Sequence, residues 1–395
     1  MNQDPVVIVS AARTPMGAFQ GELSALTAPQ LGTAAISAAI ERAGIDRELV
    51  QEVILGCVLP AGLGQAPARQ AAIGAGLPLK TTCSTVSKVC GSGMKAVMSA
   101  HDALVAGSND VIVAGGMESM TNAPYLLPKA RGGYRLGHGQ TLDHMFLDGL
   151  EDAYFERGRL MGAFAEDCAG TYGFTRQDQD GYAIASTLRA QAAIESGAFD
   201  WETTPVKISM KSGEVLVRHD EQPPKARIDR ISTLKPAFKA DGTVTPANSS
   251  SISDGAAALV LTRQSVASRL GLTPIATIRA HASYAHEPRL FTTAPVGAIR
   301  AVLGKAAWSA ADVDLWEINE AFAVVAMACM RDLALDHEKV NVHGGACALG
   351  HPIGASGARI LVTLLGALKR RGAKRGVASL CIGGGEATAV AIEMS

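Results

Sequence analysis

Residues 356–385 read SGARILVTLLGALKRRGAKRGVASLCIGGG, and this stretch decides the fold class. It predicts a helix from Ser356-Gly357, a polar turn, and an apolar strand that ends in three glycines. Residues 92–116, SGMKAVMSAHDALVAGSNDVIVAGG, repeat this order of helix start, helix, turn, strand and glycine turn. We interpret the repetition as an internal duplication of one α/β unit, with faint sequence identity between the two copies.

Strands and helices alternate outside these copies as well. Val6–Val9 and Val111–Gly116 are continuous apolar runs, which is typical of strands buried on both faces. A helical pattern covers Ala28–Ala43 and stops at Gly44, a residue type that commonly ends helices. This alternation predicts a mainly parallel α/β sheet.

The middle of the chain, residues 121–247, is richer in prolines, charges and aromatic residues. We expect an insertion of loops and short helices over the sheet edge, which is a common place for a binding surface. Residues 223–230 form a basic loop in this insertion. Two interpretations of the loop stay open, a solvated surface or a contact with phosphates of a ligand.

The bulk composition excludes several classes of protein. The chain has 395 residues, 48% of them hydrophobic and 18% charged, which indicates a large core in two domains or a duplicated domain. The net charge of −1 provides no basic field for nucleic acid or a membrane surface. Without a signal-like segment or an apolar run of about 18 residues, we expect a soluble, cytoplasmic protein.

The cysteines are spread along the chain. There are seven, and no C-x-x-C pair occurs among them. We therefore expect neither a disulfide framework nor a zinc site. Taken singly, each cysteine is as well explained by packing in the core.

Three residues in glycine-rich turns carry candidate chemistry. Cys90 stands just before a predicted helix, whose dipole and free amides would stabilise its thiolate. Cys381 precedes three glycines in a similar context, and His351 lies between glycines beside Pro352, which suits a base or hydrogen-bond donor. Two cysteines and a histidine in such turns indicate carbonyl chemistry through a thioester.

Asn319 follows the strand-like run Leu315–Ile318. The carboxyl end of a strand in an open α/β sheet is where ligands bind, so Asn319 is a candidate site residue. A helix cap is an equally open interpretation, because asparagine is a preferred capping residue.

Together these segments resemble the thiolase family, in the family's order and spacing. The resemblance covers the whole chain and lies closest to the short-chain acetyl-CoA acetyltransferase branch. It rests on residues 89–96, 115–120, 319–322, 341–345, 348–357 and 381–385, with 11–15 and 253–257 in agreement.

The resemblance implies a layered α/β core made of two similar βαβαβαββ halves, with an inserted loop domain. The N-terminal half would comprise residues 1–120 and 248–272, the loop domain 121–247, and the C-terminal half 273–395. The implied activity is the reversible condensation of two acetyl-CoA to acetoacetyl-CoA and free CoA, through an acetyl-cysteine.

The resemblance also implies a role for each catalytic candidate. Cys90 would be the nucleophile, and His351 would take its proton and help to hold the oxyanion. Cys381 would remove a proton from the methyl group of the second acetyl-CoA. Asn319 would position a water in one oxyanion hole, and the amides of Cys90 and Gly383 would form the other.

The remaining implied residues concern substrate binding. Ser250 matches a serine that touches the pantetheine arm, and Met161 matches a methionine that narrows the acyl pocket. Leu160 stands where many short-chain members have histidine. Coenzyme A thioesters would be substrates, with no cofactor and no metal. The other implied substrate-binding residues are Lys225 and Arg227 near the nucleotide end of coenzyme A, together with Ala321 and Phe322.

Three rivals differ in function. A degradative 3-ketoacyl-CoA thiolase of broader chain length would differ in its pocket lining, and Met161 favours the short-chain reading. A decarboxylating condensing enzyme lacks a second catalytic cysteine, so Cys381 argues against it. A carrier on an inactive scaffold is disfavoured because Cys90, His351, Cys381 and Asn319 all remain. The resemblance further implies a homo-tetramer, with the loop 125–138 in the assembly, and no nucleic acid or membrane partner.

Overall fold

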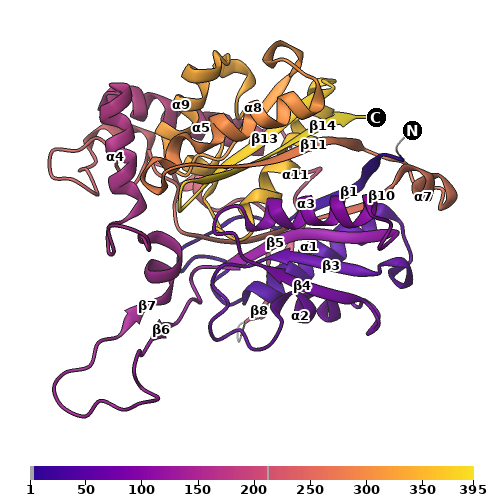
Figure 1. Cartoon of the computed structure of the whole chain (residues 1–395), viewed down its shortest axis with the longest axis horizontal. Helices are drawn as coiled ribbons and strands as arrows, with labels where there is room; N and C mark the ends of the chain where they lie inside the picture. Colours follow the sequence, from indigo (N-terminus) through magenta and orange to yellow (C-terminus); the bar gives the residue numbers. More distant parts are fainter. Residues whose placement is uncertain (1–3, 211–212) are drawn as a thin grey trace.

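The N-terminal half of the fold is a five-stranded arrangement with helices on both faces (Figure 1). The computed structural model describes residues 4–210 and 213–395. Its strands lie in the order β4-β3-β5-β10-β1. These strands are β1 (Val6–Arg13), β3 (Glu52–Gly56), β4 (Thr82–Val86), β5 (Val111–Ser119) and β10 (Ser253–Arg263), with α1 (Ala28–Ala43), α2 (Pro67–Gly74) and α3 (Ser92–Val105) between them.

The C-terminal half repeats this arrangement in the order β12-β13-β14-β11. A parallel bridge between Trp316 and Val340 stands at the outer edge, where the first half has β4. When the strands of each half are numbered along the chain, with the Val340 bridge as the third of the second half, both halves have the order third, second, fourth, fifth, first. The predicted duplication is confirmed. The elements are β11 (Ala276–Ala285), α8 (Ala294–Ala306), β12 (Leu315–Ile318), α9 (Ala323–Leu333), α11 (Ser356–Arg371), β13 (Arg375–Ile382) and β14 (Glu386–Met394).

The prediction of a mainly parallel sheet is wrong. Within the described residues, β3 pairs in parallel with β4 and β5, and β12 with β13, but the central strand pairs are antiparallel. The two halves join at β1 and β11, which are also antiparallel. Apolar runs identify strands buried on both faces and carry no information on strand direction. The turn at residues 383–385 reverses the chain directly, which forces β13 and β14 to run antiparallel.

The elements stack in five layers. Helices α1 and α2 cover one face of the first half, α3 and α11 fill the centre, and α8 and α9 cover the second half (Figure 1). Three apolar cores fill these boundaries: one under α1 and α2, one on both sides of α3 and α11, and one under α8 and α9. In the centre, a Cβ on Gly357 would lie 2.4 Å from the backbone nitrogen of Met94, so only glycine lets α3 and α11 approach this closely.

The inserted segment holds loops and short elements, and also the 20-residue helix α5 (Arg176–Glu195), which is longer than the expected short helices. β6 and β7 form the base of an arm that projects from the body (Figure 1). The predicted basic loop at 223–230 is instead largely two short helical turns, α6 and Ile228–Thr233. The insertion includes β6 (Tyr125–Leu126), β7 (Leu142–Asp143), α4 (Met161–Tyr172), α5 (Arg176–Glu195), β8 (Val206–Met210), β9 (Gly213–Val217) and α6 (Gln222–Lys225).

The remaining elements are short and lie at the surface or beside the site. They are β2 (Gly17–Ala18), α7 (Gln264–Arg269), α10 (Ala346–Leu349), the 3-10 turns Arg47–Leu49, Pro288–Thr293, Ala310–Asp312 and His337–Lys339, and a π turn at Phe146–Leu150.

None of the helices in the described part of the chain has the length and hydrophobicity that a bilayer span requires.

Candidate active site

A cavity of about 330 Å³ opens between the two halves and the inserted segment. Cys90 and His351 both line it, although 261 residues separate them in sequence. Its wall is mostly apolar, which suits an acyl chain and the pantetheine arm of a thioester. Of the predicted substrate residues, the cavity brings together Leu160, Met161, Ser250, Ala321 and Phe322.

Cys90 sits in a strained turn two residues before α3 begins at Ser92. The preceding Val89 has φ +45°, a left-handed conformation that a β-branched residue rarely adopts and that costs about 1–3 kcal/mol. Loss of solvent around the thiol raises the pKa of Cys90 to about 11, while the amides of Gly383 and Cys90 itself oppose the shift. The predicted stabilised thiolate is therefore wrong: burial outweighs the helix terminus, and the thiol needs a base.

His351 has the tautomer that a base requires. Its Nδ1 lies 2.6 Å from the Ser356 hydroxyl, and that hydroxyl donates its single proton to the carbonyl of Pro352 at 2.9 Å. Nδ1 must therefore carry the proton and donate to Ser356, which leaves a lone pair on Nε2. Nε2 is buried and has no hydrogen-bond partner among the described residues. Burial lowers the pKa of His351 to about 3, so the ring is neutral.

Cys381 is the next-to-last residue of β13, lies near Cys90 and is fully buried behind the cavity wall. Burial, with the neighbouring Cys90 as the next cause, raises the pKa of Cys381 well above its usual value. Gly384 and Gly385 have φ of +95° and +83°, which permits the tight turn into β14. Gly383 follows Cys381 by two residues, and its amide is directed at the Cys90 sulfur.

Asn319 is fully buried after β12, and its side-chain oxygen and nitrogen have no partner among residues 4–210 and 213–395. The alternative of a helix cap is wrong, because α9 starts at Ala323 with Phe322 in the capping position. A buried amide without partners costs about 1–3 kcal/mol per group, and such groups in native proteins usually serve a ligand or ordered water.

Glu118 is a site residue that belongs to the motif at residues 115–120, for which the sequence indicated no role. Its carboxylate accepts hydrogen bonds from the amides of Val58 at 2.9 Å, Leu59 at 3.2 Å and Gly354 at 2.9 Å. It thereby ties the His351 loop to the end of β3. Burial raises the pKa of Glu118 to about 7, against the effect of the three amides. Ser356 was missed likewise, and its place at the first turn of α11, five residues after His351, was the available signal.

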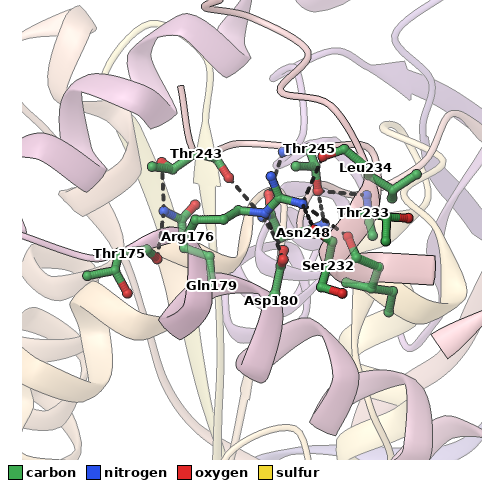
Figure 2. A network of polar contacts seen from close by, with 12 residues as sticks. Thr175, Arg176, Gln179, Asp180, Ser232, Thr233, Leu234, Thr243, Thr245 and Asn248 are labelled. Carbon is green, nitrogen blue, oxygen red and sulfur yellow. Dashed lines mark hydrogen bonds and ion pairs between the residues drawn. The ribbon is translucent and has the colours of Figure 1, made fainter. Parts of the chain in front are cut away.

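The loop that carries Ser250 is held by a polar network from α5 (Figure 2). Arg176 pairs with Asp180 and binds the carbonyls of the turn 231–234. Asp180 accepts a hydrogen bond at 3.0 Å from the amide of Asn248, which in turn fixes the chain entering Ser249 and Ser250. This network explains why the wall of the cavity keeps its shape between two irregular segments.

Lys225 and Arg227 do not line the cavity of Cys90. Both border a neighbouring surface hollow, which shares Pro246 with that cavity. Lys225 pairs with Glu22 and Glu221 at 3.1 and 2.9 Å, and Arg227 pairs with Asp229. The structure therefore separates these two residues from the reactive group and leaves them at the approach to it.

A duplicated, layered α/β fold that places a cysteine and a neutral histidine at one acyl-sized cavity, with a second cysteine behind its wall, defines an acyltransferase. Family models for "Thiolase, N-terminal domain" and "Thiolase, C-terminal domain" match residues 6–265 and 272–394. The chain belongs to the thiolase family, and the resemblance drawn from its sequence is confirmed.

Similar proteins span the same length. Acetyl-CoA acetyltransferase 2 of Arabidopsis thaliana is 53% identical over 100% of this chain and 98% of that protein. An acetyl-CoA acetyltransferase of Cupriavidus necator is 52% identical over 98% of this chain and 99% of its own. The crystal structure of the acetyl-CoA acetyltransferase of Bacillus anthracis is 42% identical, with a TM-score of 0.96 over 100% of this chain and 99% of that one.

Proposed function

We propose that this protein is an acetyl-CoA C-acetyltransferase, which interconverts two acetyl-CoA with acetoacetyl-CoA and free CoA. The observation that carries the proposal is the shared cavity of Cys90 and His351, with an unpartnered Nε2 on a neutral ring in the described structure. Relatives of about half identity that bear this name over their full length support the short-chain activity over a broader one.

In the first half-reaction, Nε2 of His351 takes the proton of Cys90, and the sulfur attacks the carbonyl of acetyl-CoA. The amides of Cys90 and Gly383 both act on the Cys90 sulfur, which supports the proposal that they form one oxyanion hole. Collapse of the tetrahedral intermediate breaks the carbon–sulfur bond to CoA. His351 returns its proton to the CoA sulfur, and Cys90 is left as an acetyl thioester.

In the second half-reaction, Nε2 of His351, free again, takes the proton of the Cys381 thiol, and the Cys381 thiolate removes a proton from the methyl group of a second acetyl-CoA. The enolate carbon attacks the acetyl group on Cys90, forms the new carbon–carbon bond and expels the Cys90 thiolate. The proton held on His351 then restores the Cys90 thiol, and Cys381 keeps the proton taken from the methyl group. Asn319 and His351, each with buried polar atoms that lack protein partners in the described part of the chain, would stabilise the enolate oxygen, in part through water.

Substrate size would be set at the closed end of the cavity. The sulfur of Met161 lies 3.5 Å from where a Cβ on Gly383 would stand, so this side chain closes the space beside the acyl carrier. Leu160, Ala321 and Phe322 would pack on the acyl and pantetheine groups, and Ser250 would touch the pantetheine amide. Lys225 and Arg227 would meet the phosphates of coenzyme A at the entrance after exchanging their carboxylate partners.

We also propose a homo-tetramer and a cytoplasmic location. The arm between β6 and β7 exposes Leu136 to 99% and Tyr125 to 70%, which supports burial of the arm against another subunit. Seven free thiols support a reducing compartment. The division into 1–120 with 248–272, 121–247 and 273–395 stays a proposal, supported by the repeated strand order of the two halves.

Thiolysis by free CoA tests the proposed function. We expect strong preference for acetoacetyl-CoA over 2-methylacetoacetyl-CoA and 3-ketohexadecanoyl-CoA. The variant Met161→Ala should gain activity on longer or branched substrates, while Leu188→Ala, an exposed position on α5, should not. Comparable wild-type rates on the sixteen-carbon substrate would overturn the short-chain assignment, and absence of thiolysis on all three would overturn the activity.

A further inference from the structure

Three potential ligand atoms converge at a point remote from the cavity, where α3 meets the first strand of the C-terminal half. His101 and Asp102 come from α3, and His281 comes from β11. Nε2 of His281 lies 2.8 Å from an Asp102 carboxylate oxygen and 3.2 Å from Nδ1 of His101. The third separation, from Nδ1 of His101 to the same oxygen, is also 3.2 Å.

These separations match the edges of one face of a metal coordination shell. With metal–ligand bonds of about 2.0–2.1 Å, two ligands stand about 2.9 Å apart at a right angle and about 3.4 Å apart in a tetrahedron. Without a metal ion, each imidazole can present an N–H to the Asp102 carboxylate, and the cluster is then held by hydrogen bonds. A cation at the point where the three atoms converge would replace these protons and bond to all three atoms at once.

The surroundings hold the ligand residues in place. The Lys305 ammonium group donates a hydrogen bond at 3.0 Å to the backbone carbonyl of His281. His101 and His281 pack edge to face with their ring centroids 4.8 Å apart, so both rings are fixed in place. Their side chains are 19% and 16% exposed, and that of Asp102 is 57% exposed, which leaves an open side for water ligands.

We propose that His101, Asp102 and His281 bind one divalent transition-metal ion of the zinc type. Two imidazoles and one carboxylate suit Zn²⁺, Co²⁺ or Ni²⁺ and are unsuited to Mg²⁺ or Ca²⁺, which prefer oxygen ligands. The ion ties α3, whose first turn follows Cys90, to β11, and so cross-links the two halves at their central layer. Its role is structural, because none of the three residues lines the cavity.

Cobalt titration of the chelator-treated full-length protein tests the site. We expect visible absorption that saturates at one Co²⁺ per chain, without the near-ultraviolet thiolate band that binding to Cys90 would produce, and displacement by Zn²⁺. Loss of an outer-shell partner weakens metal binding by about 10–100-fold. His101→Gln and His281→Gln remove direct ligands, so each should weaken Co²⁺ binding by at least that factor. The control His138→Gln removes an exposed histidine on the arm and should leave binding unchanged.

Each outcome of the Co²⁺ experiment either supports or overturns the metal site. Acetoacetyl-CoA thiolysis and the far-ultraviolet circular dichroism of both variants should match wild type, which shows that the variants fold. A saturable Co²⁺ site that persists in both variants would overturn the proposal, as would the absence of binding at millimolar Co²⁺. A raised melting temperature with Zn²⁺ in the wild type and not in His281→Gln would support it independently of catalysis.

Discussion

The variant Ser356→Ala should slow acetylation of Cys90 and leave the fold intact. In the structure, the Ser356 hydroxyl accepts the Nδ1 proton of His351 at 2.6 Å in a fully buried setting. Removing it leaves a buried N–H without a partner, which costs about 1–3 kcal/mol. The cost falls on the tautomer that acts as the base, so the other tautomer gains population.

The expected loss follows from that energy. Because about 1.4 kcal/mol corresponds to a factor of ten, the acetylation rate should fall by about 5–150-fold. The KM for acetoacetyl-CoA should change little, since Ser356 does not line the cavity. Single-turnover transfer from radioactive acetyl-CoA, followed by acid quench, measures the rate of this step directly.

A matched control separates the tautomer effect from general destabilisation. Ser10→Ala removes another buried hydroxyl, which donates to the Ala39 carbonyl between β1 and α1, far from the cavity. It should lower the free energy of unfolding by a similar amount and leave acetylation unchanged. If Ser356→Ala acetylates no more slowly than Ser10→Ala, the argument that Ser356 fixes the base is refuted.

Three further predictions rest on other parts of the structure. In Cys381→Ala, Cys90 should still acetylate while carbon–carbon bond formation falls by about 10²–10⁴-fold, and equal loss of both steps would instead indicate a structural role for Cys381. Gly357→Ala should destabilise the protein by about 1–3 kcal/mol in urea unfolding, because the new Cβ meets the Met94 backbone at 2.4 Å; Gly304→Ala on α8, where a Cβ meets nothing within 4 Å, should be neutral or stabilising, and equal effects would contradict the packing argument. The pKa of His351 is about 3 in the folded protein and 6.5 as its ordinary value, so the unfolded chain binds more protons between these values and stability should fall as the pH drops from about 6.5 toward 3. His351→Gln should show a shallower loss over that range in unfolding measurements, and identical slopes for the two proteins would refute the depressed pKa.

The order of elements could be predicted from local patterns. The helix over Ala28–Ala43 ends at Gly44, which adopts the left-handed conformation with φ +64°, as the sequence indicated. The duplicated units at residues 92–116 and 356–385 also have the predicted order. Strand direction could not be predicted, because pairing of β1 with β10 joins residues about 250 positions apart and depends on the packing of the whole sheet.

The sequence predicted two of the residues that meet at the cavity, and it did not predict their electrostatics. The glycine-rich settings of Cys90 and His351 pointed to both residues, and the cavity unites them. The duplication pairs the Cys90 loop before α3 with the His351 loop before α11. Cys381 instead lies near the end of β13, so the likeness of the two cysteine turns is not a structural equivalence. The helix terminus suggested a low thiol pKa, but burial is a property of the folded environment and raised it instead.

The sequence also could not predict that Lys225 and Arg227 lie away from the cavity. Lys225 and Arg227 lie in the predicted basic segment, yet their carboxylate partners Glu22, Glu221 and Asp229 occupy them at the surface. The partners of Lys225 include a residue about 200 positions away, which no local pattern reveals. The cluster of His101, Asp102 and His281 is a similar case, since β11 meets α3 only in the folded chain.

The central claim is that Cys90 carries the acetyl group and that His351 makes it reactive. Incubation with acetyl-CoA, acid quench and peptide mass spectrometry tests it most directly, on the wild type, Cys90→Ser and His351→Gln. We expect one acetyl group on the Cys90 peptide of the wild type, none in Cys90→Ser, and slow, substoichiometric labelling in His351→Gln. An acetyl group found on Cys381 or another thiol, with Cys90 unmodified and turnover intact in Cys90→Ser, would contradict it.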